Sequence, residues 1–285
     1  MRAFEADSSI RQKNMKHDKL NFGCGLRFSS NWANIDFHSE DNRVQRVNLL
    51  AGFPYPDSSF EVVYSSHVLE HFDREQGRFL LAESYRVLRK GGILRIVVPD
   101  LQASCSEYLR ILSLPDNPIK EKLYSWIIIE MLDQMVRTVP SGEMGRFVNK
   151  VMASDDEEFK KYIRSRTQNT RWSPPAKSTF REKLKKITPQ KLSTKMSYWY
   201  MLLLARLIPK SLRNMIFVQT SVGERHRWMY DEFGLKLLFE NLGFKEVRRV
   251  EFNVSSILDF NADNLDSNLD GQPYKHNSIY MEGIK

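Results

Sequence analysis

The sequence has few cysteines and no long apolar run. Its 285 residues include two cysteines, Cys24 and Cys105, which are too few for a disulfide framework, so we expect a reducing compartment. No segment reaches the roughly 18–20 apolar residues that a membrane span requires. The N-terminal residues are polar and do not resemble a secretory signal. We therefore expect a cytoplasmic protein that contacts a membrane at most peripherally.

Acidic residues are scarce in one part of the chain. Between Lys160 and Arg213 there are fifteen Lys or Arg residues and one acid, Glu182. This segment carries a charge of about +14, whereas the whole chain carries +8, so the remainder is close to −6. The basic character therefore belongs to one segment and does not describe the protein as a whole.

Short strands and a well-delimited helix alternate in the first hundred residues. Asp73 and Gln76 predict a capping box at the start of this helix, and Gly91-Gly92 predicts its end. A strand at 93–98 follows. Strands alternating with helices indicate a parallel sheet with helices on both faces. The strands expected before the helix span residues 19–22, 34–36, 44–49 and 61–66.

This alternation stops after about residue 103 and returns near the C-terminal part of the sequence. A helix is expected at 231–242, and strands at 245–254 and 278–283. Because no helix separates these two strands, we expect an antiparallel pair at one edge of the sheet. The predicted organisation is a flexible tail at 1–17, a core at 18–105 and 223–285, and a helical basic insertion at 106–222 that forms a lid or acceptor region.

A glycine turn, Gly23-Cys24-Gly25, directly follows the first strand. Glycine lets the backbone approach a ligand closely, and a following helix would offer unpaired N–H groups. The third glycine of the dinucleotide-binding fingerprint is missing, because residues 26–28 are Leu, Arg and Phe. Taken alone, the turn is equally typical of an ordinary strand-to-helix connection.

Four segments in this order resemble the class I S-adenosylmethionine-dependent methyltransferases, most closely the small-molecule group called type 11. The part from Gly223 to the last strand resembles relatives in glycan and lipopolysaccharide biosynthesis. The resemblance covers 18–105 and 223–285 and leaves the insertion unexplained. The four segments are LNFGCG at 20–25, NID at 34–36, FPYPDSSFEVVYSSHVLEHF at 53–72 and RVLRKGGILRIVVPDL at 86–101.

The resemblance implies a doubly wound, mostly parallel seven-stranded sheet of Rossmann-like type, with an antiparallel last strand and the helical insertion. It also implies S-adenosyl-L-methionine as the cofactor, bound outside the carboxyl ends of the strands. The glycine turn would contact its methionine part, Asp36 its ribose hydroxyls, and residues 48–49 its adenine, while 65–67 would face the sulfonium. The cofactor-binding residues implied in this way are Gly23, Cys24, Gly25, Asp36, Asn48, Leu49, Ser65, Ser66 and His67.

The activity that the resemblance implies is methyl transfer, and we expect the acceptor to be an oxygen on a sugar, a glycan or another small polar molecule. A hydroxyl acceptor needs a base to remove its proton, whereas an amine or a thiolate does not. From their positions at strand ends and in loops, His67 is the first candidate, followed by His226 and Asp100. The alternative for His67 is a structural residue at the start of a helix.

Residues 67–71 read His-Val-Leu-Glu-His and also match the H-x-x-E-H pattern of zinc hydrolases. In such enzymes the two histidines are one helical turn apart and bind the metal. Here the motif directly follows a predicted buried strand downstream of a glycine turn, which is the wrong context. We therefore expect no metal, and a zinc hydrolase is the least favoured alternative.

The insertion allows several interpretations. The apolar stretch 198–208, flanked by Lys195 and Lys210, is expected to cover the active site or to lie at an anionic membrane surface. Basic runs near Trp172 also suit contacts with RNA, but no recognised RNA-binding module accompanies them. An inactive scaffold is a further alternative, which the intact glycines and Asp36 disfavour.

Overall fold

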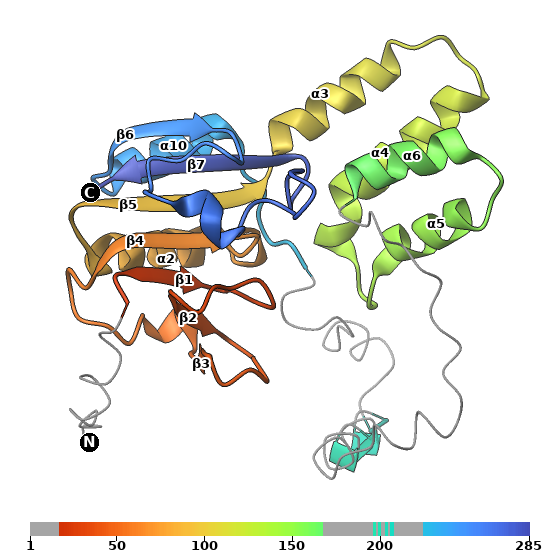
Figure 1. Ribbon diagram of the computed structural model, residues 1–285. Coiled ribbons are helices and arrows are strands. Elements are labelled where there is room, and N and C mark those ends of the chain that lie inside the picture. The colour runs from red at the N-terminus through yellow and green to blue at the C-terminus, as the bar shows by residue number, and fades with distance from the viewer. Residues whose placement is uncertain (1–16, 168–195, 198, 201–202, 205, 208–224) are drawn as a thin grey trace.

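The computed structural model describes residues 17–167 and 225–285, together with 196–197, 199–200, 203–204 and 206–207. These residues contain a seven-stranded sheet in the order β3-β2-β1-β4-β5-β7-β6. Figure 1 shows the sheet with a group of helices beyond one of its ends. The strands are β1 (Lys19–Phe22), β2 (Ala33–Asp36), β3 (Val44–Arg46), β4 (Phe60–Ser66), β5 (Leu88–Pro99), β6 (Lys245–Val250) and β7 (Ser278–Ile284).

The first five strands are parallel to one another, and β7 is antiparallel to both of its neighbours, β5 and β6. The register places Val97 opposite Tyr280 and Pro99 opposite Ser278. The expected Rossmann-like sheet with an antiparallel last strand is therefore confirmed. The register also brings the start of β7 to the carboxyl end of β5, beside the candidate site described below.

Two helices, α2 (Arg74–Val87) and α10 (Glu232–Asn241), pack on one face of the sheet (Figure 1). The capping box at the start of α2 is confirmed, because Asp73 accepts from the Gln76 N–H and Gln76 accepts from the Asp73 N–H. Leu80 and Leu81 of α2 are fully buried in the apolar core between this helix and the strands. Burial of this face is the main favourable contribution to folding.

The predicted end of α2 at Gly91-Gly92 is wrong. The helix ends at Val87, and Leu88 is already extended and begins β5. Leu88 pairs with Phe60 of β4 and is fully buried in the core. Sheet pairing and burial of Leu88 therefore override a helical pattern that continues in the sequence as far as Lys90.

The other face of the sheet is covered by residues 251–277, which include the 3₁₀ helix η3 (Phe260–Asp263). Trp32, Tyr64 and Phe260 form a cluster of edge-to-face and tilted aromatic contacts there. In the described part of the chain, a long loop thus takes the place that we expected a helix to occupy. Apolar residues in the loop still exclude water from this side of the sheet.

A fully buried arginine joins this loop to the sheet. Arg95 of β5 forms ion pairs of 2.7 Å with both Asp266 of the loop and Glu282 of β7. Its guanidinium also donates to the main-chain carbonyls of Glu251, Phe252 and Val254. Because burying an unpaired charge is costly, these partners hold the loop in one conformation.

Four helices lie beyond the carboxyl end of β5 (Figure 1). They have a small apolar core of their own around Trp126 and Ile163. The core boundary expected at residue 105 falls inside the first of them. Most of the expected tail at 1–17 and the segment 168–195 of the insertion lie outside the described residues. The four helices are α3 (Leu101–Leu112), α4 (Pro118–Val136), α5 (Gly142–Met152) and α6 (Glu157–Arg166).

The buried ion pairs predict a large difference between two arginine variants. Replacing Arg95 by leucine leaves Asp266 and Glu282 buried without a partner, and we expect a loss of about 3–5 kcal/mol in the free energy of unfolding. Arg89 pairs with Asp18 and Glu61 at the surface. Arg89→Leu should therefore cost at most about 1 kcal/mol. Urea denaturation measures both variants, and equal losses would contradict the structural role of Arg95.

Candidate active site

The glycine turn lies at the carboxyl end of β1 and is held against β2. The Gly23 N–H donates to the Ile35 carbonyl at 2.8 Å, and the Gly25 N–H donates to an Asp36 carboxylate oxygen at 2.8 Å. Both glycines have positive φ, 64° for Gly23 and 53° for Gly25. A Cβ on Gly23 would lie 2.3 Å from Cγ2 of Val68, so no side chain fits there. Glycine is thus required at position 23 by its positive φ and by the packing of Val68 against the turn.

A cavity of about 190 Å³ lies beside this turn. The turn residues 23–25 line it, as do Ser66 and His67 from the end of β4. Tyr274 and Lys275 close it from the loop that Arg95 holds. Of the nine residues predicted to bind the cofactor, the structure therefore brings Gly23, Cys24, Gly25, Ser66 and His67 together around one cavity.

The other four predicted residues do not line this cavity. Asp36 is at the end of β2, where its second carboxylate oxygen accepts from the His38 N–H. Asn48 caps the 3₁₀ helix η1 (Leu49–Ala51), and Leu49 is buried in the core. The Ser65 hydroxyl is buried and donates to the Phe22 carbonyl at 2.9 Å. Asp36 remains beside the glycine turn, whereas the Ser65 side chain stabilises the contact between strands.

Cys24 is not a candidate nucleophile. Burial, followed by the nearby charge of Asp36, raises the pKa of its thiol to about 12. The thiol is therefore protonated at neutral pH and much less reactive than a thiolate. Cys24 contributes a small, buried side chain to the turn.

His67 stands between this cavity and a second one. It follows β4 with a positive φ of 55°, and its N–H donates to the Val97 carbonyl. Its Nε2 lies 2.9 Å from Ser278 Oγ, and its Nδ1 lies 3.2 Å from Glu70 Oε1. Burial lowers the pKa of this imidazole, although the charge of Glu70 opposes the shift.

The second cavity has a volume of about 570 Å³ and lies between the sheet and the helices α3, α4, α5 and α6. His67 and Lys275 line both cavities. The second cavity is also lined by Glu70, His71 and His226, which approach one another there. The structure thus places two of the predicted catalytic residues, His67 and His226, around the same space.

Glu70 lies at the base of the second cavity, in the 3₁₀ helix η2 (Leu69–His71), and only 1% of it is exposed. Burial by itself would raise the pKa of this carboxyl group. The neighbouring imidazoles of His67, His71 and His226 outweigh burial and lower the pKa to about 2. Glu70 is therefore an ionised carboxylate at neutral pH.

His71 and His226 pack with their rings edge to face, 5.1 Å between centroids. The main-chain N–H of His226 donates to the Gln134 carbonyl of α4, which fixes the returning chain at the cavity. Burial lowers the pKa of His226 to about 4, in spite of the nearby Glu70 charge. His226 is therefore a neutral imidazole at pH 7.

Asp100, the third candidate base, has other partners in the structure. Its carboxylate caps α3 by accepting from the Ala103 N–H and forms an ion pair of 3.0 Å with Arg249. It is 98% buried and is not among the residues that line either cavity. The structure therefore gives the Asp100 carboxylate a helix cap and an ion pair as partners and places it outside both cavities.

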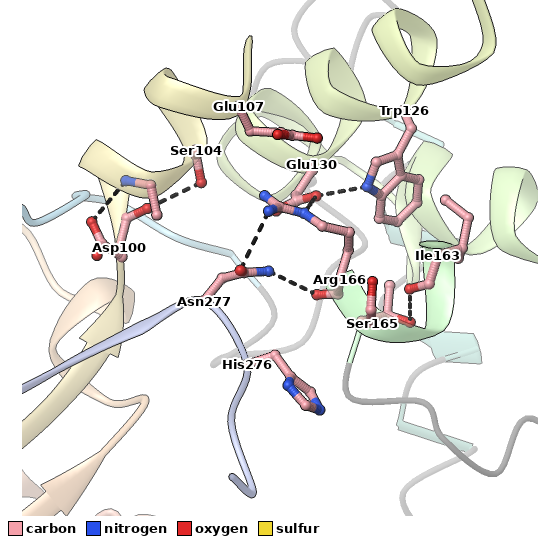
Figure 2. A network of polar contacts seen from close by, with 12 residues as sticks. Asp100, Ser104, Glu107, Trp126, Glu130, Ile163, Ser165, Arg166, His276 and Asn277 are labelled. Carbon is pink, nitrogen blue, oxygen red and sulfur yellow. Dashed lines mark hydrogen bonds and ion pairs between the residues drawn. The ribbon is translucent and has the colours of Figure 1, made fainter. Parts of the chain in front are cut away.

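The helices that wall the second cavity are tied to the sheet by a polar network (Figure 2). Arg166 of α6 forms a two-point ion pair with Glu130 of α4, and Trp126 donates to the same carboxylate at 2.6 Å. Arg166 also donates to the Asn277 side chain, directly before β7. In Figure 2 the ring of His276 points away from this network. The helical wall of the second cavity is thus positioned from the C-terminal end of α6.

The geometry of a zinc hydrolase is absent from the H-x-x-E-H segment. Residues 69–71 form one 3₁₀ turn, and His67 is in the left-handed region. The two histidines of the motif therefore do not share one face of an α-helix, which the zinc-hydrolase pattern requires. Glu70 lies in a 3₁₀ turn outside the helical context of the motif, so the sequence did not single it out. Lys275 and Ser278, which also belong to the site, carried no local signal at all.

Comparisons with known proteins found one family model and several solved structures. Residues 20–96 match the model of a family described as "Methyltransferase domain". A methyltransferase from Thermotoga maritima, titled as a possible histamine N-methyltransferase, is 13% identical with a TM-score of 0.37, covering 94% of this chain and 81% of its own. An Archaeoglobus fulgidus methyltransferase is 12% identical with a TM-score of 0.37, covering 98% and 92%. No curated protein matches the chain.

The domain match covers the glycine turn and β4, whose residues line one side of the smaller cavity. The chain therefore contains an S-adenosylmethionine-dependent methyltransferase domain, and its sheet has a Rossmann-like strand order. S-adenosyl-L-methionine is its cofactor, and the glycine turn, with open space beside Gly25, fits its close approach. We refer below to the smaller cavity as the donor pocket and to the larger one as the acceptor cavity.

Two glycine variants test the donor pocket. We expect Gly23→Ala to weaken binding of S-adenosylmethionine at least about tenfold, because the new Cβ meets Val68 and displaces the turn. Gly91 has a φ of 80° but no atom within 4 Å of an added Cβ. Gly91→Ala should cost about 1–2 kcal/mol of stability from backbone strain alone and leave donor affinity unchanged. Calorimetric titration with the donor measures both, and equal affinities would argue against binding at the turn.

Proposed function

We propose that this methyltransferase transfers the methyl group to a hydroxyl oxygen of a small polar acceptor of the sugar or glycan type. The observation that carries the proposal is the position of His67, which lines the donor pocket on one side and the acceptor cavity on the other. A group in this position touches both reactants. The acceptor oxygen and the donor methyl would meet beside its imidazole ring.

The acceptor cavity supports a hydroxyl-rich molecule. Its volume of about 570 Å³ lies within the range typical of small-molecule sites. Its walls carry polar groups that donate and accept hydrogen bonds, among them Gln134, Thr167 and Asn277. Arg137 also lines it, and the Nε of its guanidinium is buried without a hydrogen-bond partner. A sugar offers hydroxyl groups to such walls at several points.

The donor supplies a methyl group that its positively charged sulfur already activates, so the protein has mainly to position the reactants. His67 is placed to accept the hydroxyl proton at Nε2. Ser278 Oγ lies 2.9 Å from this nitrogen and also donates to the His276 carbonyl at 3.1 Å. Ser278 can therefore leave Nε2 free when an acceptor hydroxyl approaches. Glu70 orients the ring from the Nδ1 side.

An activity screen with radiolabelled donor tests the proposal. It would compare sugar nucleotides, lipid-linked glycans, free oligosaccharides and RNA as acceptors. We expect label in one of the carbohydrate classes. Label in RNA alone would replace the proposal by the RNA alternative, and failure to bind S-adenosylmethionine in calorimetry would point to an inactive scaffold.

Replacement of His67 gives a more specific prediction. His67→Ala should lower kcat by about 10²–10⁴-fold, since it removes the group that accepts the proton. Donor affinity should change much less, because the glycine turn is left intact. His17→Ala is the matched control, since His17 belongs to neither cavity. Near-normal kcat in His67→Ala would contradict the proposed role.

A further inference from the structure

We propose that Glu70, His71 and His226 bind a divalent transition-metal ion at the base of the acceptor cavity, where it coordinates the acceptor hydroxyl. The role of the ion in catalysis rests on the function proposed above. The binding of the ion does not rest on that function, because the three ligand residues are present in the protein whatever the acceptor is.

The three side chains converge from two distant parts of the chain. One potential ligand atom from each of them lies within 4.8 Å of the other two. Glu70 and His71 belong to the turn η2 after β4, whereas His226 belongs to the segment that returns from the insertion. Ligand atoms around an ion with bonds of about 2.0–2.1 Å are roughly 3–3.5 Å apart. Side-chain shifts of about 1 Å would therefore complete the site.

The carboxylate of Glu70 is the first independent sign of a missing partner. It is 99% buried, and among the described residues its Oε2 has no hydrogen-bond partner. Its Oε1 lies 3.2 Å from His67 Nδ1 and 4.0 Å from His71 Nε2. A buried carboxylate with one oxygen left unsatisfied is unfavourable, whereas coordination to a cation satisfies both its charge and its lone pairs.

The tautomer of His71 is the second sign. Its Nδ1 lies 3.0 Å from the main-chain carbonyl of Arg225, which can only accept. Nδ1 therefore carries a proton, which leaves Nε2 on the side of Glu70, 4.0 Å from Oε1. A carbonyl that fixes the tautomer in this way is the usual outer partner of a metal-binding histidine.

His226 can present a lone pair as well. Its Nε2 lies 3.0 Å from the side-chain amide of Gln134. Since the oxygen and nitrogen of an amide exchange places on a half-turn, Gln134 can accept from an Nε2–H group. The proton is then on Nε2, and Nδ1 of His226 is left as a ligand. His67 would remain outside the coordination sphere and donate from Nδ1 to Glu70.

The donor set selects the type of ion. Two imidazoles and one carboxylate favour zinc, manganese, iron or cobalt over calcium. Three protein ligands leave coordination positions open, which is typical of catalytic rather than structural sites. All three residues line the acceptor cavity, so the open positions face the space that an acceptor would occupy.

A metal ion at this place has a direct use in the reaction. A hydroxyl bound to a divalent cation loses its proton far more easily than a free one. The proton passes to His67, and the acceptor oxygen forms a bond to the methyl carbon. The bond between this carbon and the donor sulfur breaks, and its electron pair stays on sulfur. The products are a methyl ether, S-adenosylhomocysteine and one proton, which His67 releases to water.

Lys275 is the rival partner of the Glu70 charge, since it lines the same cavity and the Glu70 carboxylate acts on its pKa. If its ammonium group balances the carboxylate, no cation is needed. The measurement of metal binding distinguishes the two cases without any assay of activity.

The experiment uses the full chain, dialysed against chelator and then titrated with Mn²⁺ and Zn²⁺ by calorimetry, with metal content measured after gel filtration. We expect one ion per chain in the wild type and in the His17→Ala control. Glu70→Gln and His226→Ala should weaken binding at least about 100-fold. Circular dichroism and donor binding would show that both variants are folded. A wild type that retains no ion, or folded variants that bind as tightly as the wild type, would overturn the site.

Activity then separates this inference from the proposed function. We expect the chelated enzyme to bind the donor normally and to regain methyl transfer when Mn²⁺ or Zn²⁺ is added. Full methylation of a carbohydrate in excess chelator would refute the metal site and leave the proposed function intact. One bound ion without methylation of any carbohydrate would refute the proposed function and leave the site intact.

Discussion

The ion pairs of Arg95 are the constraint on which the site depends. A guanidinium without access to water must keep its partners, and here they come from the loop at 251–277 and from β7. This requirement fixes the loop against the sheet and so carries Tyr274 and Lys275 to the donor pocket. The start of β7 is fixed in the same way and brings Ser278 to His67. The side chains at the two cavities are therefore positioned by a charge cluster on the face of the sheet that α2 and α10 do not cover.

The parts of the fold that could be predicted from the sequence are those with local signals. The glycine turn, the capping box at Asp73 and the short strands depend on neighbouring residues, and the structure contains them. The end of α2 could not be predicted, because it is decided by the pairing of Leu88 with another strand. The partners of Arg95 could not be predicted either, since Asp266 is 171 residues away and no periodic pattern joins them.

The candidate site, like the fold, could be predicted only in part. Polar side chains at strand ends were predicted to form the site, and one of them, His67, lies between the two cavities. The same prediction included Asp100, which caps a helix, and Ser65, which joins two strands. A carboxylate or a hydroxyl at the end of a strand serves either purpose, and the sequence does not distinguish them. Glu70 belonged to a motif whose known context is a helix, so its role emerged only when the turn and His226 were seen together.

The place of β7 between β5 and β6 has a consequence for synthesis on the ribosome. Residues 278–284 are made long after β5, so the nascent chain presents β5 as an open strand edge for nearly two hundred residues of elongation. Arg95 is also without Asp266 and Glu282 during this time. An unpaired strand edge is prone to pairing with another chain. Pairing of this edge and neutralisation of Arg95 must both wait until β7 has been made.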